Sequence, residues 1–219
     1  MKDLDYFLYL LDNKTPFCVV RFNDGELGAI TKTMHMVSRG DQDVTDALSK
    51  KLKEAMLHRQ ENYYVGMPDS KFKKHAEIAD KLVGDYENVT SSVIFHDNNW
   101  IKAITELPKY TNQFERVVWV GSEQHDVSKL PFKVTEFVPV NHKNAFDSYN
   151  RLREMTPLKN TLVFLSCGPL GRVIGKDWFE AEPECTVLEV GSIYDPWVQN
   201  VKRRYQKKLW SEYLKTVKK

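Results

Sequence analysis

Short apolar runs alternate with amphipathic segments along most of this chain, and this alternation limits its fold more than any other feature. The runs are rich in β-branched and aromatic residues, as buried strands are, and cover residues 17–22, 63–67, 92–95, 116–120, 134–140, 161–167 and 186–190. Segments between or after them have helical periodicity, at 44–57, 72–83, 145–155, 170–179 and 197–217. This order predicts an α/β fold, a single Rossmann-like domain with a mainly parallel sheet flanked by helices.

The length of 219 residues suits one domain, which we expect to span residues 1–219. No apolar run approaches the roughly 20 residues that a membrane-spanning helix needs. The N-terminal stretch lacks the basic start and the cleavage site of a signal peptide. The three cysteines (Cys18, Cys167 and Cys185) have no metal-ligand spacing, which indicates buried thiols in a reducing compartment. We therefore expect a cytoplasmic protein.

The charge balance argues against nucleic acid as a partner. The chain has 32 Lys and Arg against 30 Asp and Glu, a net charge of +2, so no broad positive field surrounds it. Basic residues are concentrated in 197–219, which we expect to be a basic amphipathic helix. Such a helix either packs one apolar face on the domain in solvent or makes a peripheral contact with an anionic membrane.

Candidate site residues follow the first predicted strand. Ligands of parallel α/β sheets bind at the carboxyl ends of strands, and here Arg21 precedes an acidic turn, Asp24-Gly25-Glu26. Asp24 could cap the next helix, with Glu26 in its first turn. Alternatively, the two carboxylates hold Mg²⁺ or Mn²⁺ while a substrate diphosphate completes its coordination, and Gly25 allows a close approach. Arg21 would then bind a phosphate or orient a carboxylate.

Two further strand ends carry polar residues. Ser166, Gly168 and Pro169 lead into a helix with Pro169 at its first position, either as an ordinary turn or as a cradle for a diphosphate. Cys167 lacks an identifiable histidine partner, so we do not expect it to be a nucleophile. Asp195 lies at the start of the last predicted helix. It could cap that helix, be a third carboxylate near the metal, or act as a general base.

Asn144 is a candidate for a different role. It can cap the helix that starts after it, or its amide can bind a ribose or uracil edge. His96 follows a predicted strand and is a candidate to face the same site.

Three stretches resemble the GT-D type glycosyltransferases, first catalogued as DUF1792. Residues 16–27 (PFCVVRFNDGEL) are similar to that family's R-F-G-D-G-E-L motif, with Asn23 in place of glycine. Residues 137–152 (FVPVNHKNAFDSYNRL) are similar to its Pro-x-x-Asn-Ala-Phe-x-x-Tyr stretch. Residues 162–175 (LVFLSCGPLGRVIG) are similar to its strand, Gly-Pro turn and helix. The resemblance covers the chain from Pro16 to about Trp197.

The resemblance implies a nucleotide-sugar-binding domain with metal-dependent hexosyltransferase activity. The donor would be a UDP-sugar, the acceptor a glycan, a glycoprotein or a lipid-linked sugar, and the cofactor Mn²⁺ or Mg²⁺ on Asp24 and Glu26. With the strand ends read as above, we expect Asp24, Glu26 and Asp195 to serve catalysis and Arg21, Gly25, Asn144, Ser166, Gly168 and Pro169 to bind the donor. We expect Asp24→Asn and Glu26→Gln to abolish transfer with little loss of stability.

Two other functions fit the sequence. One is a non-catalytic nucleotide-sugar-binding subunit of a glycosylation assembly. The other is a methyltransferase that uses residues 117–124 (VVWVGSEQ) as its first strand and loop.

Overall fold

A parallel seven-stranded sheet forms the centre of the protein. The computed structural model describes residues 1–33, 42–69, 73–155, 157 and 159–217. The strands are β1 (Cys18–Arg21), β2 (Tyr63–Met67), β3 (Val89–Ser91), β4 (Arg116–Ser122), β5 (Glu136–Val140), β6 (Thr161–Ser166) and β7 (Thr186–Glu189). Their order is β3-β2-β1-β7-β6-β4-β5, and every neighbouring pair is parallel. This confirms the predicted α/β fold.

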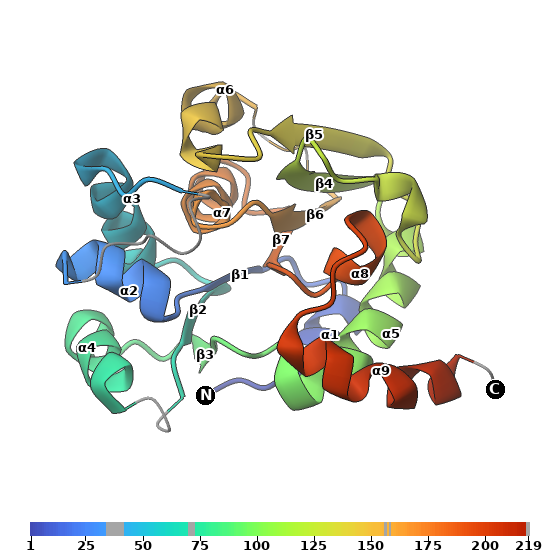
Figure 1. Ribbon diagram of the computed structural model, residues 1–219. Helices are drawn as coiled ribbons and strands as arrows, with labels where there is room; N and C mark the ends of the chain where they lie inside the picture. Colours follow the sequence, from blue (N-terminus) through green and yellow to red (C-terminus); the bar gives the residue numbers. More distant parts are fainter. Residues whose placement is uncertain (34–41, 70–72, 156, 158, 218–219) are drawn as a thin grey trace.

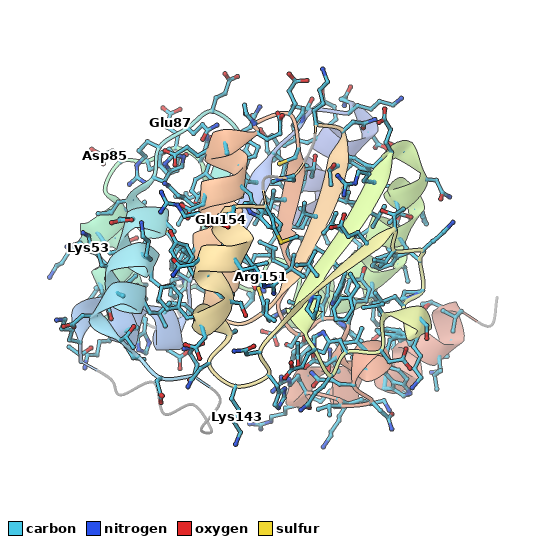
Figure 2. All side chains as sticks on the ribbon, turned by 90° about the horizontal axis from the view of Figure 1, so that it is seen from above. Lys53, Asp85, Glu87, Lys143, Arg151 and Glu154 are labelled. Atoms are coloured by element: carbon cyan, nitrogen blue, oxygen red, sulfur yellow. The ribbon has the colours of Figure 1, made fainter. Side chains whose placement is uncertain are left out.

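Helices cover both faces of the sheet (Figure 1). The α-helices are α1 (Leu4–Asp12), α2 (Asp24–Thr31), α3 (Asp46–Leu57), α4 (Lys73–Val83), α5 (Trp100–Tyr110), α6 (Tyr149–Arg153), α7 (Leu170–Ala181), α8 (Asp195–Val198) and α9 (Arg204–Thr216). Helices α2, α3, α4, α6 and α7 pack on one face, and α1, α5, α8 and α9 on the other. Figure 2 shows charged side chains such as Lys53, Asp85 and Glu87 projecting from the outside of these layers.

The two hydrophobic cores follow from the period of two along each strand. In β1, Cys18 and Val20 belong to the core beneath α7, while Val19 belongs to the core beneath α1 and α5. All three cysteines are buried and unpaired, as predicted. Across the described part of the chain, no helix has the length and apolar character needed to cross a bilayer.

The order of the strands brings distant loops together. The chain builds β1 to β3 outward to one edge, crosses to β4 and β5 at the other edge, and returns through β6 to place β7 beside β1. The carboxyl ends of β1, β6 and β7 therefore meet in the middle of the sheet. Ligands of open α/β sheets bind where the strand order reverses in this way.

Two sequence predictions of local structure were wrong. Residues 92–95 form a turn after β3 rather than a strand, closed by the bond from the Ile94 amide to the Ser91 carbonyl. The predicted helix over 197–217 is two helices, because Asn200 adopts a left-handed conformation (φ 54°) between α8 and α9.

Helices α1 and α5 were not predicted. Their signal is present in the sequence: in α5, Trp100, Ala103, Ile104 and Leu107 are buried at helical spacing.

Candidate functional site

Two adjoining hollows lie at the carboxyl edge of the sheet. We call the first the charged lobe, of about 380 Å³; it is lined by Arg21, Asn23, Asp24, Gly25, Glu26, His96, Arg172, Gly191, Ser192 and Asp195. We call the second the amide lobe, of about 470 Å³; it is lined by Gln42, Ser122, Val140, Asn141, His142, Ala145 and Cys167. The two lobes share His125, Ser166, Gly168, Pro169, Gln199 and Arg203. They therefore form one continuous cleft.

The floor of the charged lobe is a buried ion pair between β1 and β7. Arg21, the last residue of β1, is 1% exposed, and Glu189, the last residue of β7, is 0% exposed. Nε of Arg21 donates to Oε2 of Glu189 at 2.9 Å and to the Glu189 carbonyl at 2.7 Å. Of the two predicted roles of Arg21, orienting a carboxylate is the one the structure shows.

Arg172 in the first turn of α7 joins the same network. Its Nε donates to the Arg21 carbonyl and its Nη1 to the Gly168 carbonyl, both at 2.6 Å. Nη1 also lies 3.2 Å from Oε1 of Glu189, and Nη2 lies 3.3 Å from Oε1 of Glu26. The guanidinium therefore connects the ends of β1 and β7 with the turn after β6.

The acidic turn places its two carboxylates in different environments. Helix α2 begins at Asp24 with Asn23 as its N-cap, so the prediction that Asp24 is the cap was wrong. Glu26 is buried and accepts from the Asn23 amide at 3.0 Å, in addition to its ion pair with Arg172. Asp24 is exposed at the wall of the lobe, with no hydrogen-bond or ion-pair partner in the described residues.

His96 supports Arg21 from the opposite side. Its Nε2 lies 3.1 Å from Nη1 of Arg21, and its ring stacks on Tyr205 with the centroids 5.1 Å apart. Burial, and then the charge of Arg21, hold the pKa of His96 well below its usual range. A neutral imidazole accepts the Arg21 N–H at this position.

Asp195 forms the wall between the sheet and the C-terminal segment. It is buried, and Oδ2 accepts from Nε of Arg203 at 2.7 Å. Burial raises the pKa of this carboxyl, and the bond to Arg203 opposes the rise. The side chain lines the charged lobe, as its predicted role requires.

The turn after β6 separates the two lobes. Gly168 has a φ of +59°, which a side chain would strain, and Pro169 is the N-cap of α7 rather than its first helical residue. The Ser166 hydroxyl donates to the Gly191 carbonyl at 2.8 Å. Burial raises the pKa of the Cys167 thiol to about 12, in line with the expectation that it is no nucleophile.

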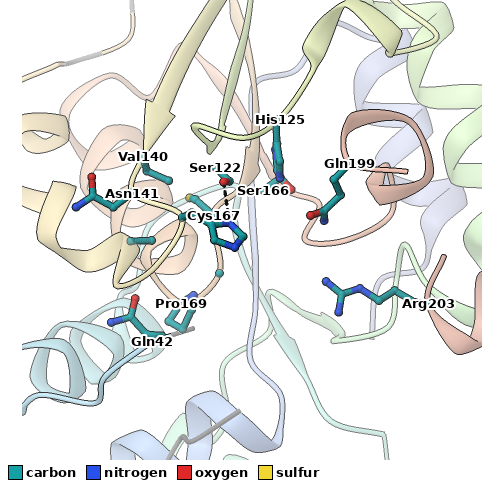
Figure 3. A pocket seen from close by; sticks show the side chains of 13 residues that line it. Gln42, Ser122, His125, Val140, Asn141, Ser166, Cys167, Pro169, Gln199 and Arg203 are labelled. Atoms are coloured by element: carbon teal, nitrogen blue, oxygen red, sulfur yellow. Dashed lines mark hydrogen bonds between the residues drawn. The ribbon is translucent and has the colours of Figure 1, made fainter. Parts of the chain in front are cut away.

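The amide lobe is lined mainly by uncharged polar groups and short apolar side chains, with Arg203 as its one charged residue among those described. Figure 3 shows Gln42, Asn141 and Gln199 around it, with Arg203 at one side. The Ser122 hydroxyl and Nδ1 of His142 are 3.0 Å apart. Burial, and then the neighbouring His142, lower the pKa of His125 to about 4, so its ring adds no charge near neutral pH.

Position 121 has no space for a side chain, because the rings of His125 and Trp119 lie against it. A Cβ on this glycine would be 2.5 Å from Nδ1 of His125 and 2.6 Å from Nε1 of Trp119. The two rings therefore fill the space beside Gly121, and a larger residue there would displace one of them.

Asn144 lines neither lobe. Its Oδ1 accepts from the Asp43 amide at 2.7 Å and its Nδ2 donates to the Asp43 carboxylate at 3.1 Å. The amide that we predicted to bind a nucleoside therefore holds the segment before α3, and Gln42 beside it reaches the amide lobe instead.

Several residues of the cleft were missed by sequence reasoning. Arg172, His125, Gln199 and Arg203 line the cleft and Glu189 lies beneath it, and the sequence singled out none of them, although Arg172 falls within the stretch 162–175. The one local signal is Glu189, a carboxylate at the end of the otherwise apolar run 186–190.

The charges of the lobe fit a hard divalent cation bound together with a phosphate. Three guanidinium groups (Arg21, Arg172 and Arg203) and three carboxylates (Asp24, Glu26 and Asp195) line the lobe, with Glu189 buried beneath it, and each guanidinium is paired with a carboxylate. Within the described ranges, Asp24 remains uncompensated. Among the residues with described positions, no cluster of three or more His, Cys, Asp or Glu could hold a metal ion, so Asp24 and Glu26 would need further ligands from outside the chain to hold Mg²⁺ or Mn²⁺.

Solved structures of domain of unknown function 1792 share this fold. A selenomethionine-substituted structure matches with a TM-score of 0.67 and 19% identity over 88% of this chain and 78% of that chain. A second, described as having a distinct glycosyltransferase fold, matches with a TM-score of 0.66 and 18% identity over the same shares of the two chains. A third, described as a new glycosyltransferase from Streptococcus sanguinis, has a TM-score of 0.64 and 18% identity over 88% of this chain and 81% of that chain.

These likenesses establish that the chain has the glycosyltransferase fold of the DUF1792 structures, as the sequence resemblance led us to expect. No protein-family model matches the chain, and neither does any curated protein.

Proposed function

We propose that this protein is a glycosyltransferase that moves a hexosyl group from a nucleotide-sugar to an acceptor hydroxyl. The donor class is a UDP-sugar, and the acceptor is a glycan, a glycoprotein or a lipid-linked sugar. The observation that carries the proposal is the two-lobed cleft, which joins a compartment rich in charged side chains to one lined mainly by uncharged groups, at the carboxyl ends of β1, β6 and β7 in a glycosyltransferase fold. A nucleotide-sugar has the same division between a charged diphosphate and neutral rings.

The charged lobe would receive the diphosphate. Arg203 is the most accessible of its three arginines, with 39% of its side chain exposed, and the Gly168 turn leads into the N-terminus of α7. Backbone amides and the dipole at a helix start favour phosphate. Negative charge grows on the diphosphate as the sugar leaves, and fixed donors at this position stabilise that charge.

A divalent cation, Mn²⁺ or Mg²⁺, would be held by Asp24 with Glu26 as its second carboxylate. The lobe and the buried Glu189 beneath it together have one more carboxylate than guanidinium groups, so a cation that enters with the diphosphate would make its binding more favourable. When bound, the ion supplies charge neutralisation for the leaving diphosphate. Arg172 would keep one oxygen of Glu26 in place throughout.

The amide lobe would hold the neutral rings through hydrogen bonds from Gln42, Asn141 and Gln199. Asp195 lies in the charged lobe next to the shared residue Gln199. A carboxylate with a pKa raised by burial is a stronger base, and we assign Asp195 to accept the proton of the acceptor hydroxyl. Three free buried cysteines support a reducing compartment, the cytoplasm.

One observation favours a second candidate, a nucleotide-sugar-binding subunit without activity. Two of the three proposed catalytic carboxylates, Glu26 and Asp195, are already paired with arginines. Such pairing suits a binding site that has no chemistry to perform.

The first experiment is a thermal-shift panel of UDP-, GDP-, dTDP- and CMP-sugars, each with and without Mn²⁺. A ligand that binds the native state raises the midpoint, by about 2.7 kcal/mol of stabilisation at a hundredfold excess over its Kd. We expect a Mn²⁺-dependent rise with the UDP-sugars, lost in Asp24→Asn. No response to any nucleotide would overturn both candidates.

A test for hydrolysis of the nucleotide-sugar by the purified protein distinguishes the two candidate functions. Slow release of free sugar with Mn²⁺ supports the transferase. Binding without hydrolysis, and without transfer to added glycans, supports the subunit.

A further inference from the structure

The C-terminal segment concentrates positive charge that the rest of the chain does not share. Residues 201–219 contain eight Lys and Arg and a single acidic residue, Glu212, which is a net charge of +7. The whole chain has a net charge of +2, so residues 1–200 have a net charge of −5. An opposite-sign distribution of this kind orients a protein near a charged surface.

Helix α9 separates its apolar and basic residues onto two faces. The inner face, formed by Tyr205, Gln206, Leu209, Trp210 and Tyr213, packs against the core around Trp100. Four basic residues at helical spacing, Arg204, Lys207, Lys208 and Lys215, form the outward face and are exposed. None of the four has an ion-pair partner in the part of the chain that the structure describes.

Apolar side chains accompany the basic face. Of the six large hydrophobic residues that are exposed in the described ranges, three lie in this segment: Val201 (44%), Leu214 (39%) and Val217 (55%). The aromatic rings of α9 pack against Trp100 of the domain and are partly buried there. Exposed aliphatic groups next to lysines suit a lipid headgroup region better than a nucleic acid backbone.

We propose that the outward face of α9 docks the protein on an anionic membrane surface as a peripheral contact. Figure 1 shows α9 at the outer edge of the molecule, where a flat surface can reach it. The net negative charge of residues 1–200 favours an orientation in which α9 is the part nearest an anionic bilayer. Arg203, immediately before α9, lines the cleft, and docking therefore brings the cleft close to the membrane.

The test is co-sedimentation of the full-length protein with vesicles of phosphatidylcholine alone and of phosphatidylcholine with phosphatidylglycerol. We expect binding to the anionic vesicles only, weakening as salt is raised. The triple variant Lys207→Glu, Lys208→Glu and Lys215→Glu should bind at least about 100-fold more weakly, at about fivefold for each lysine lost. A matched control, Lys50→Glu, Lys53→Glu and Lys74→Glu, changes the same charge at exposed positions of α3 and α4 and should bind like the wild type.

Thermal melting checks that both triple variants are folded. If charge reversal unfolds α9, the variant with Lys207, Lys208 and Lys215 all replaced by Gln repeats the test, because glutamine is neutral and a good helix former. Equal binding to both vesicle types, no binding to either, or equal losses in the two triple variants would overturn the proposal. Binding of duplex DNA or of RNA through the same lysines, without vesicle binding, would overturn it in favour of nucleic acid. None of these readouts requires a nucleotide-sugar, so they are independent of the proposed enzyme activity.

Discussion

The guanidinium of Arg21 and the carboxylate of Glu189 form a fully buried ion pair, with 2.9 Å between Nε and Oε2, at the ends of two adjacent parallel strands. The pair lies directly beneath the charged lobe, and Glu189 also neutralises Arg172. It connects the strand that leads to the acidic turn with the strand that leads to Asp195. The geometry of the proposed diphosphate site therefore depends on a carboxylate below its floor.

Glu189→Gln should destabilise the protein by about 3–5 kcal/mol, because it leaves two buried guanidinium groups with less negative charge around them. Urea denaturation measures the change in the free energy of unfolding. Glu136→Gln is the control: Glu136 pairs with Arg116 at the surface, where both side chains are about one-third exposed, and its loss should cost less than about 1 kcal/mol. Equal losses would contradict the importance that we assign to the buried pair.

Gly191→Ala should distort the same floor. Gly191 has a φ of +57°, and a Cβ there would lie 2.5 Å from Nη2 of Arg21. Gly84 has a similar φ of +62°, but a Cβ there would have no atom within 4 Å, so Gly84→Ala measures the backbone cost alone, about 1–2 kcal/mol. We expect Gly191→Ala to lose more stability than Gly84→Ala and also to weaken nucleotide binding. Identical losses would show that Arg21 moves aside without cost.

Asp24→Asn and Glu26→Gln should separate function from stability. Asp24 is exposed and unpaired in the described residues, so Asp24→Asn should change the free energy of unfolding by less than about 0.5 kcal/mol while abolishing the Mn²⁺-dependent response to nucleotide. Glu26→Gln loses an ion pair with Arg172 and should cost about 1–3 kcal/mol, in contrast to the small loss expected from the sequence. Isothermal titration with Mn²⁺ and UDP, with Asp85→Asn as a surface control, gives the binding readout. A full metal response in Asp24→Asn would refute the assignment.

Stability should fall as the pH drops from 6.5 toward about 4, in part because of His125. Its pKa is lowered from 6.5 to about 4 in the native protein, so the unfolded chain takes up the proton first and acidification favours unfolding. The shift sets a ceiling of about 3 kcal/mol, and because part of the ring reaches the cleft we expect about 1–2 kcal/mol. In denaturation experiments, His125→Gln should weaken the dependence of the free energy of unfolding on pH over this range. An unchanged dependence would show that the pKa of His125 is not lowered in the native protein.

Most of the strands and helices could be predicted because they depend on local patterns. Alternation of residues 17–22 and the strands after them with amphipathic helices indicates a parallel sheet, and the turn from Arg21 to Glu26 marks the carboxyl end of the first strand as a site. Local signals also misled. Residues 92–95 have the composition of a strand but form a turn, whose Ser92 carbonyl accepts a hydrogen bond from the Arg21 guanidinium.

Which charges meet in the cleft was decided only by the tertiary structure. Arg21 and Glu189 are 168 positions apart, and they become neighbours because the chain returns β7 to the side of β1. Asn144 shows the same limit: its sequence context suits both a ligand and a cap, and only folding places Asp43 beside it. Periodicity and turn chemistry act over a few residues, so local patterns in the sequence indicate most of the strands and helices and the acidic turn. The ion-pair partner of each charged residue depends on chain crossovers that no local pattern specifies. As a result, Glu26 and Asp195 are paired with arginines, while Asp24 has no ion-pair partner among the described residues.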